Sequence, residues 1–296
     1  MELKAYLGEK RAVVEEALRG VFPEPEGPSA DIISAMGYSL FAGGKRLRPI
    51  LCMAGAEAVG GEAQDVLPVA CAIELIHTYS LIHDDLPVMD DDDMRRGKPT
   101  SHKVFGEAVA LLAGDGLLTK AFHVMAGADF ENRVRPDALL TVIGLIAQAA
   151  GYEGMVGGQV VDIQSEGQEV DSSIVQFIHT HKTAALIAAS VVSGAILAGG
   201  EEDQVSALTS YGQNIGLAFQ VSDDILDIEG NSQALGKNVG SDERQAKTTY
   251  PAVLGLSRSK EIQRELVEQA IEFLDPFDRR SDPLRHIAKY IIVRKK

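Results

Sequence analysis

The sequence is poor in several features that mark particular classes of protein. Only two cysteines occur, Cys52 and Cys71, and their spacing fits neither a metal site nor a redox motif. A zinc site or a disulfide framework is therefore disfavoured, and two reduced, buried thiols are expected. The residues after Met1 begin a charged helical pattern and not the apolar stretch of a signal peptide. We therefore expect a cytoplasmic protein.

Positive charge is also scarce. The chain has 28 Lys and Arg against 43 Asp and Glu, which gives a net charge of -15. A nucleic-acid-binding surface or electrostatic docking on an anionic membrane needs a basic face, so neither partner is expected. Residues 183–200 are uncharged and just long enough to span a bilayer, but they are mostly small, and Glu201 follows them. We interpret them as a buried helix and expect no membrane span.

Strand signals are missing as well, because alternating β-branched or aromatic runs bounded by turns do not occur. Helical periodicity with abundant Ala and Leu dominates instead. We predict one all-α domain over residues 1–296, in which helices 138–150 and 184–198, apolar nearly all round, lie at the centre. The predicted helices cover residues 3–20, 30–43, 46–60, 65–86, 106–126, 136–152, 172–199, 203–229 and 260–274.

The first chemical signal is the aspartate-rich run 84–93, which follows an apolar helical stretch. Acidic runs are usually solvated loops, but carboxylates at the end of a buried helix are costly unless a cation neutralises them. On an unbroken helix, Asp84 and Asp90 would lie about 120° apart. Pro87 disturbs the helix and can let Asp90 return toward Asp84. The run therefore predicts a cation site at the end of this helix.

A second acidic cluster contains Asp223, Asp224 and Asp227, with Gln220 at the start of the same i, i+3, i+4, i+7 pattern. This spacing places the amide and the three carboxylates on one helix face, where the like charges repel unless a cation is present. Oxygen ligands without His or Cys favour Mg²⁺. Two such clusters on otherwise apolar helices predict a magnesium-held polyanion.

Cations that could bind such an anion occur in distant segments. Lys45 and Arg48 stand at a helix start, where backbone N–H groups also bind anions, although a basic helix end on the surface is the alternative. His77 lies within about 20° of Asp84 around the helix, and a satisfied core histidine is equally plausible. The remaining candidates, each weak alone, are Arg95, Arg96, His181, Lys182, Lys237 and Lys247.

With these motifs in order, nearly the whole chain resembles the trans-isoprenyl diphosphate synthase family, and bacterial farnesyl diphosphate synthases in particular. The resemblance implies an all-α isoprenoid synthase fold, with helices around a deep central cavity, and a homodimer. Met94 and Ser222 depart from common choices without removing a donor, whereas Ser241 replaces a frequent lysine. The motifs that carry the resemblance are 43–49, 84–97, 157–162, 181–183, 216–227, Lys237, 249–251 and 290–294.

The resemblance also implies roles for the site residues. Three Mg²⁺ ions would bind the carboxylates of Asp84, Asp85, Asp90, Asp223, Asp224 and Asp227. The allylic diphosphate, dimethylallyl or geranyl, would be held by Arg95, Lys182, Thr183, Gln220, Lys237 and Lys247. Isopentenyl diphosphate would be held by Gly44, Lys45, Arg48, His77 and Arg96. The groups that act on the allylic cation would be Lys182, Thr183 and Gln220.

The expected reaction is ionisation of the allylic diphosphate, attack by the alkene of isopentenyl diphosphate, and loss of a proton to the released diphosphate. Tyr79 and Ser80 lie one turn before Asp84, where the bulky ring of Tyr79 would block a growing chain and Ser80 would not. The resemblance implies a fifteen-carbon product, because an aromatic residue there with the longer Asp84–Asp90 spacing resembles fifteen-carbon synthases. Simple core packing of Tyr79 is the alternative. A geranylgeranyl synthase, a terpene cyclase and a non-catalytic, cation-binding partner subunit remain open as alternative functions.

Overall fold

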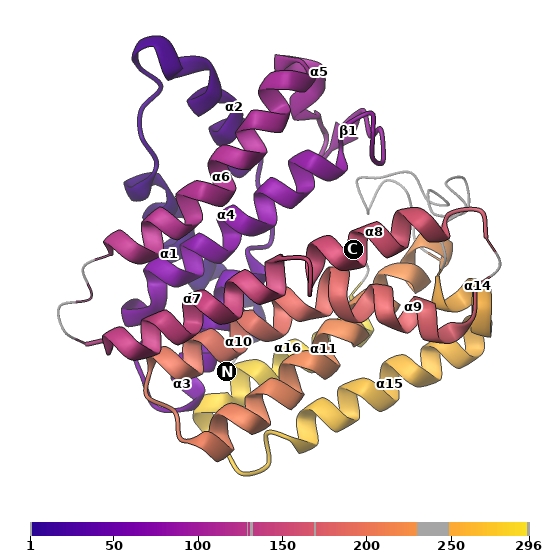
Figure 1. The fold of residues 1–296 in the computed structure, drawn as a ribbon. Helices are drawn as coiled ribbons and strands as arrows, with labels where there is room; N and C mark the ends of the chain where they lie inside the picture. Colours follow the sequence, from indigo (N-terminus) through magenta and orange to yellow (C-terminus); the bar gives the residue numbers. More distant parts are fainter. Residues whose placement is uncertain (1, 129, 131–132, 169, 230–248, 295–296) are drawn as a thin grey trace.

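The computed structural model describes residues 2–128, 130, 133–168, 170–229 and 249–294. Nearly all regular structure in these residues is helical (Figure 1). A two-stranded antiparallel hairpin joins β1 (Met94–Arg95) to β2 (Lys98–Pro99). The α-helices are α1 (Leu3–Val21), α2 (Ala30–Leu40), α3 (Leu47–Ala58), α4 (Leu67–Asp84), α5 (Ser101–Phe105), α6 (Glu107–Gly127), α7 (Pro136–Ala150), α8 (Met155–Ser165), α9 (Ser172–Ile178), α10 (Ala185–Leu197), α11 (Glu202–Glu229), α14 (Tyr250–Leu254), α15 (Leu256–Glu272) and α16 (Asp282–Val293).

The predicted all-α class is confirmed, and every predicted helix has a counterpart. The largest difference lies in the segment predicted as one helix over 172–199. It is divided into α9, a π-helix η3 (His179–Ala184) and α10. The helix predicted over 260–274 begins earlier, at Leu256. The helices α5, α8, α14 and α16 were not predicted from the sequence.

Small residues allow the central helices to pack closely. A Cβ on Gly55 of α3 would collide with the backbone of Val191 in α10, and a Cβ on Gly194 of α10 would collide with the backbone of Cys52. Gly212 of α11 lies against α10 in the same way. Glycines on α3, α10 and α11 therefore let three core helices pack closely, and α10, from the uncharged segment, is buried as expected.

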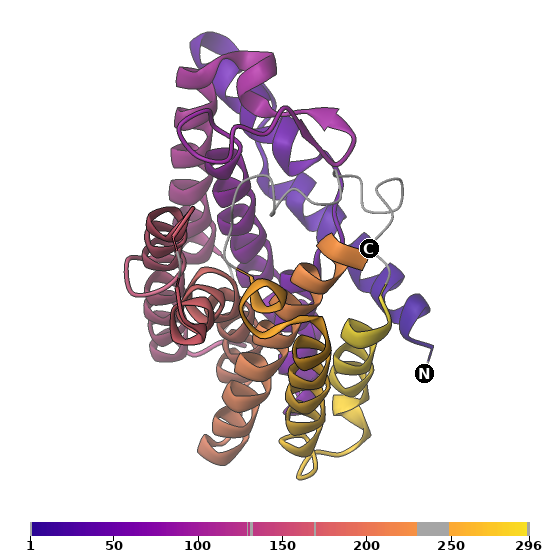
Figure 2. The same cartoon turned by 90° about the vertical axis from the view of Figure 1, so that its right-hand side faces the viewer.

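The helices that carry the two aspartate clusters belong to different parts of the core. Helix α4 lies beside α6 in the upper part of Figure 1, whereas α11 lies beside α10 and α15 below. The view in Figure 2 shows the same division, with the C-terminal helices, in orange and yellow, below the N-terminal ones. Helix α10 contacts α3, α4 and α11. Both cluster-bearing helices are therefore anchored on one central helix.

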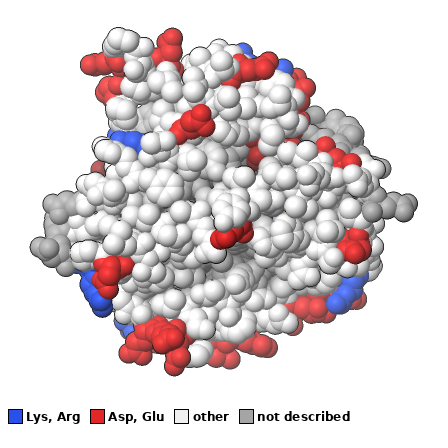
Figure 3. All heavy atoms as spheres, in the orientation of Figure 1, with Lys and Arg blue, Asp and Glu red and all other residues white. Residues whose placement is uncertain are grey.

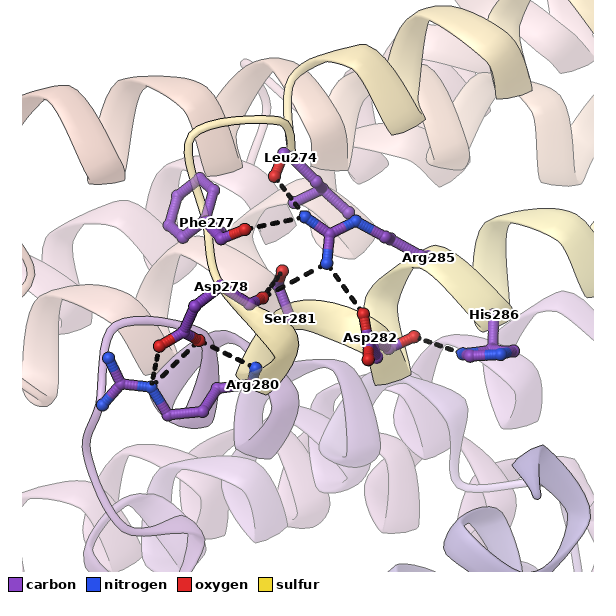
Figure 4. Close-up of polar contacts among 8 residues, drawn as sticks. All are labelled: Leu274, Phe277, Asp278, Arg280, Ser281, Asp282, Arg285 and His286. Atoms are coloured by element: carbon purple, nitrogen blue, oxygen red, sulfur yellow. Dashed lines mark hydrogen bonds and ion pairs between the residues drawn. The ribbon is translucent and has the colours of Figure 1, made fainter. Parts of the chain in front are cut away.

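The turn between α15 and α16 is fixed by one arginine (Figure 4). Arg285 donates from Nη2 to the carbonyl oxygens of Leu274 (2.5 Å) and Phe277 (2.9 Å) and from Nη1 to Asp282 Oδ1 (2.8 Å). It therefore binds carbonyl groups that follow the end of α15, which have no helical partner. This network sets the direction of α16, whose C-terminal end reaches α11 through Arg294.

Four stretches are long and apolar enough to cross a membrane, namely Ala63–Asp84, Glu107–Gly127, Pro136–Ser165 and Ser172–Leu197. In the most apolar 18-residue window of the first and last stretches, 72% and 67% of the window is buried inside the protein. The corresponding shares for the middle two stretches are 39% and 33%. The absence of a membrane span therefore stays a prediction. The two exposed stretches form α6, α7 and α8, and the face in Figure 3 that includes them carries few charged groups.

Candidate active site

The first aspartate cluster forms a turn directly after α4. The helix ends at Asp84, and the amide of Asp90 donates to the carbonyl oxygen of Asp84 (2.9 Å). The amide of Asp91 likewise donates to Leu86 O (3.1 Å). The return of Asp90 toward Asp84, which Pro87 predicted, is therefore confirmed at the level of the backbone. Both carboxylates are only half-buried.

Asp85 is placed differently from its neighbours. It is buried, at 3% exposure, and the guanidinium of Arg95 on β1 donates to both of its carboxylate oxygens, at 2.7 and 2.9 Å from Nε. Burial raises the pKa of Asp85, and the hydrogen bond from Arg95 opposes this shift. A buried, two-pronged pair of this kind fixes the direction of the arginine. Asp85 therefore holds Arg95 beside the half-buried carboxylates.

The second cluster lies near the C-terminal end of α11. Asp223 Oδ1 accepts a hydrogen bond from Arg294 Nη2 (2.7 Å), and the Arg294 guanidinium lies over the ring of Phe219 at 3.9 Å. Asp224 is only 2% exposed and accepts hydrogen bonds from Gln220 Nε2 (3.1 Å) and from the amide of Tyr250 (3.0 Å). Asp223 and Asp227 are more exposed. Buried hydrogen bonds to Asp224, like those from Arg95 to Asp85, therefore compete with the metal-ligand role predicted for these two carboxylates.

Of the three residues predicted to act on the allylic cation, Thr183 and Gln220 are in contact at η3. Thr183 donates from its hydroxyl to Gln220 Oε1 (2.9 Å), so the π-helix and α11 are linked directly. Lys182 Nζ instead donates to Asp162 Oδ2 on α8 (2.5 Å). A Cβ on Gly158 would collide with the backbone of Lys182, so a glycine is needed where α8 crosses η3. Short π-helical segments are frequent at functional sites.

The residues predicted to bind isopentenyl diphosphate surround the loop before α3. The guanidinium of Arg96 packs on Gly44, where a Cβ would lie 3.1 Å from its atoms, and Arg96 donates to the carbonyl oxygen of Gly43. Gly44 has a φ of 141°, which a residue with a side chain rarely adopts. Lys45 is exposed, and Arg48 is half-buried.

Electrostatics connects these groups into one site. Burial lowers the pKa of His77 well below 6.5, and the nearby positive charges of Arg48, Arg96 and Arg95 lower it further. Burial also lowers the pKa of Arg48, and Arg96 adds to this, while the negative charges of Glu74 and Asp223 oppose it. Several cations thus crowd one imidazole, which is unfavourable unless an anion binds among them.

The same interactions relate the two aspartate clusters. Asp223 of α11 acts on Arg48, and Asp84 at the end of α4 acts on Arg95. Since Arg48 and Arg95 both act on His77, the ends of the two helices lie within electrostatic range of one cationic centre. The arrangement can bind polyanions through cations and, at the half-buried carboxylates, hold hard divalent ions.

The predicted chain-length residues lie one turn below the first cluster. Tyr79 is 6% exposed within the apolar core, and its ring meets that of His83 edge to face. Burial and the charge of Asp84 raise its pKa to about 12. Ser80 donates to the carbonyl oxygen of His77 (2.9 Å). Control of the product length by Tyr79 stays a prediction. Lys237, Ser241 and Lys247 lie outside the described residues.

Several residues of the site were missed at the level of sequence. They are Asp162, which holds Lys182, Arg294, which holds Asp223, and Glu74, which pairs with Arg46 and lowers the positive field at Arg48. Asp162 and Arg294 stood in motifs that had been noticed, but their partners lie far away in sequence. A further group, Asp91, Asp93 and His102, places three possible metal ligands within 4.8 Å of one another.

Known proteins resemble this chain over nearly its full length. The family model described as polyprenyl synthetase matches residues 30–287. A heterodimeric geranylgeranyl pyrophosphate synthase large subunit of Arabidopsis thaliana is 49% identical over 99% of this chain and 80% of its own. A farnesyl diphosphate synthase of Geobacillus stearothermophilus is 48% identical over 99% and 98%. The apo structure of an FPP/GFPP synthase from Zymomonas mobilis superposes with a TM-score of 0.88, at 38% identity and 98% coverage of both chains.

Proposed function

Since this chain belongs to the polyprenyl synthetase family, we propose that it is a magnesium-dependent synthase of farnesyl diphosphate. Its substrates would be isopentenyl diphosphate and, in turn, dimethylallyl and geranyl diphosphate. The observation that carries the proposal is that half-buried carboxylates of both clusters, Asp84 and Asp223, lie within electrostatic range of the arginines around His77. Prenyl chain elongation is the activity of the family, and the fifteen-carbon product is the finer part of the proposal.

The carboxylates that would hold Mg²⁺ are those of Asp84, Asp90, Asp223 and Asp227, which are all accessible to solvent. They fit magnesium because they are oxygen donors that leave room for water and phosphate oxygens, and three ions are proposed. Mg²⁺ held by these carboxylates would supply positive charge to the allylic diphosphate and to the departing diphosphate. Asp85 contributes by holding Arg95, and Lys182 adds a second cation to the allylic side.

The orientation of Gln220 suits a developing allylic cation. Its Nε2 donates to Asp224, which as a carboxylate can only accept, so Oε1 is fixed at the opposite end of the amide. Oε1 lies beside the Thr183 hydroxyl and exposes partial negative charge at η3. Preorganised dipoles of this kind stabilise a transition state without reorganisation. No protein nucleophile is required, because the alkene attacks and the released diphosphate takes the proton.

Isopentenyl diphosphate would bind on the other side of the site. Arg48 and Arg96 provide guanidinium donors, of which Arg96 is held by the carbonyl oxygen of Gly43, and the exposed Lys45 provides an ammonium group. Gly44 supplies backbone close to Arg96. His77 would gain a proton or donate a hydrogen bond once the anion has reduced the positive field around it. A terpene cyclase would have no use for this second diphosphate site.

Tyr79 supports a fifteen-carbon product. Its ring is buried one turn below Asp84, and the proposal places it in the path of the elongating chain. Relatives named for farnesyl and for geranylgeranyl synthesis are almost equally similar to this chain, so identity does not separate the two products. The geranylgeranyl synthase is therefore the alternative, and it would require the ring of Tyr79 to leave the path of the chain.

We also propose a homodimer in the cytoplasm. The apolar side chains that α6, α7 and the start of α8 expose include Leu112 (53% exposed) and Leu140 (71% exposed). The chemically matched occupant for this weakly charged face (Figure 3) is the same face of a second copy, as two-fold symmetry requires. One relative is named as the large subunit of a heterodimer, so a different partner subunit is the alternative.

Product analysis tests the proposal directly. Purified protein with geranyl and isopentenyl diphosphates should release pyrophosphate and form farnesyl diphosphate only when Mg²⁺ is present. Asp84→Asn and Asp223→Asn should each lower the rate by at least about a hundredfold, since both would remove ligands to the diphosphate. Unchanged turnover in either variant would contradict the metal assignment, and a twenty-carbon product would favour the alternative.

A further inference from the structure

Arg46 stands between the predicted substrate ligands Lys45 and Arg48, but it points into the protein. Its side chain is fully buried, and its backbone is left-handed, with a φ of 53° and a ψ of 35°. This conformation is unfavourable for a residue with a long side chain and persists only where the surroundings enforce it. Something other than local preference therefore fixes the loop that begins α3.

The guanidinium of Arg46 joins three helices. Its Nε donates to Glu15 Oε1 on α1 (2.8 Å), and its Nη1 donates to Glu74 Oε1 on α4 (2.7 Å). Its Nη2 donates to the carbonyl oxygen of Leu40 at the end of α2 (2.7 Å). Only a planar guanidinium offers donors in three fixed directions, so lysine cannot replace it. The group fixes the loop position and its backbone twist together.

The pairing with Glu74 connects this loop to the other half of the predicted isopentenyl diphosphate site. Glu74 is 2% exposed and lies three residues before His77 on α4. The neighbouring residue Thr78 donates back to the carbonyl oxygen of Glu74 (2.8 Å). The distance between Lys45 and Arg48 on one side and His77 on the other is therefore set through one buried ion pair.

We propose that Arg46 is a positioning residue for isopentenyl diphosphate, which acts by fixing the loop before α3 against α4. This inference rests on the proposed function for the identity of the ligand. Arg46 itself makes no contact with the substrate. It determines whether the donors on both elements reach one diphosphate at the same time, and a shift of about 1 Å can cost about a hundredfold in rate.

The first test is Arg46→Lys, which keeps the charge but cannot bind all three acceptors. The KM for isopentenyl diphosphate should rise about tenfold or more, while the KM for geranyl diphosphate should change by less than about twofold. Arg285→Lys is the matched control, because Arg285 also binds several carbonyl groups but lies in the α15–α16 turn. It should lower the melting temperature without changing either KM. Equal changes in both KM values for Arg46→Lys would overturn the inference.

The second test separates positioning from stability. The double variant Arg46→Met with Glu74→Leu removes both buried charges and leaves the net charge unchanged, and such replacements often preserve stability. A melting temperature near that of the wild type with a raised KM for isopentenyl diphosphate supports positioning. If the double variant has both the melting temperature and the KM for isopentenyl diphosphate of the wild type, Arg46 acts through stability alone. If the wild type makes no prenyl product, the proposed function fails. Calorimetric titration of isopentenyl diphosphate then tests this inference separately, because weaker binding to Arg46→Lys than to the wild type supports it and equal binding overturns it.

Discussion

The replacement Tyr79→Ala should lengthen the product by one isoprenyl unit. Tyr79 is 6% exposed, one turn below Asp84, and its phenol ring contains more heavy atoms than the five-carbon unit that each condensation adds. Burial of an extra unit is worth about 4 kcal/mol, at about 0.8 kcal/mol per carbon. Since 1.4 kcal/mol corresponds to a factor of ten, removal of the ring should change the ratio of twenty- to fifteen-carbon product by more than about a hundredfold.

Chromatography of the products from radiolabelled isopentenyl diphosphate measures this ratio. Tyr79→Phe keeps the ring and should keep the fifteen-carbon product, and Ser80→Ala should also have no effect. The Tyr79→Ala protein will lose about 3–5 kcal/mol of stability, as expected when a buried aromatic side chain is removed, so the assay belongs well below its melting temperature. An unchanged product from folded Tyr79→Ala protein would show that the ring only packs in the core.

Four further predictions concern charge, metal and assembly. Burial and then the nearby arginines lower the pKa of His77, so at low pH His77 is protonated in the unfolded chain but not in the folded one. The free energy of unfolding should therefore fall as the pH drops below about 6.5, and His77→Gln should make that fall smaller. If urea titrations give the same pH dependence for the wild type and His77→Gln, the prediction is wrong. Asp162→Asn should raise the KM for geranyl diphosphate about tenfold by releasing Lys182, and no change would mean that their 2.5 Å pair is irrelevant to binding. Chelation by EDTA should stop pyrophosphate release, and added Mg²⁺ should restore it; turnover that persists in EDTA contradicts the metal requirement. In light scattering, Leu112→Glu should convert a dimer to monomers, whereas Phe273→Glu, which lies after α15, should leave the dimer intact. A dimer in both variants would show that the interface does not include Leu112.

Much of the fold follows from the sequence because apolar periodicity is strong over long segments. The helices that were missed have local reasons. Helix α5 has five residues, and Gly157 and Gly158 at the start of α8 argue against a helix by propensity. The close crossing of η3 explains why Gly158 is tolerated there. Helix α16, which was also missed, starts at Asp282 and carries Pro283 in its first turn, where proline is tolerated.

The site was predictable where neighbours in sequence form it and hidden where tertiary contacts form it. The return of Asp90 toward Asp84 was anticipated because Pro87 disturbs the helix between them. The π-helix at 179–184 differs from an α-helix only by a small change in register, which apolar periodicity cannot report. Lys182 pairs with Asp162, and Asp85 pairs with Arg95, because separate elements pack together. Spacing along the chain therefore reveals neither these pairs nor the burial of Asp85.

The central claim is that carboxylates from α4 and α11 act on one shared diphosphate. A crystal grown with Mn²⁺ and pyrophosphate tests it most directly, because anomalous scattering locates each ion. The account predicts ions bound to Asp84 and to Asp223 that contact the same pyrophosphate molecule. Ions at the two clusters with no common phosphate ligand, or at only one cluster, would contradict it.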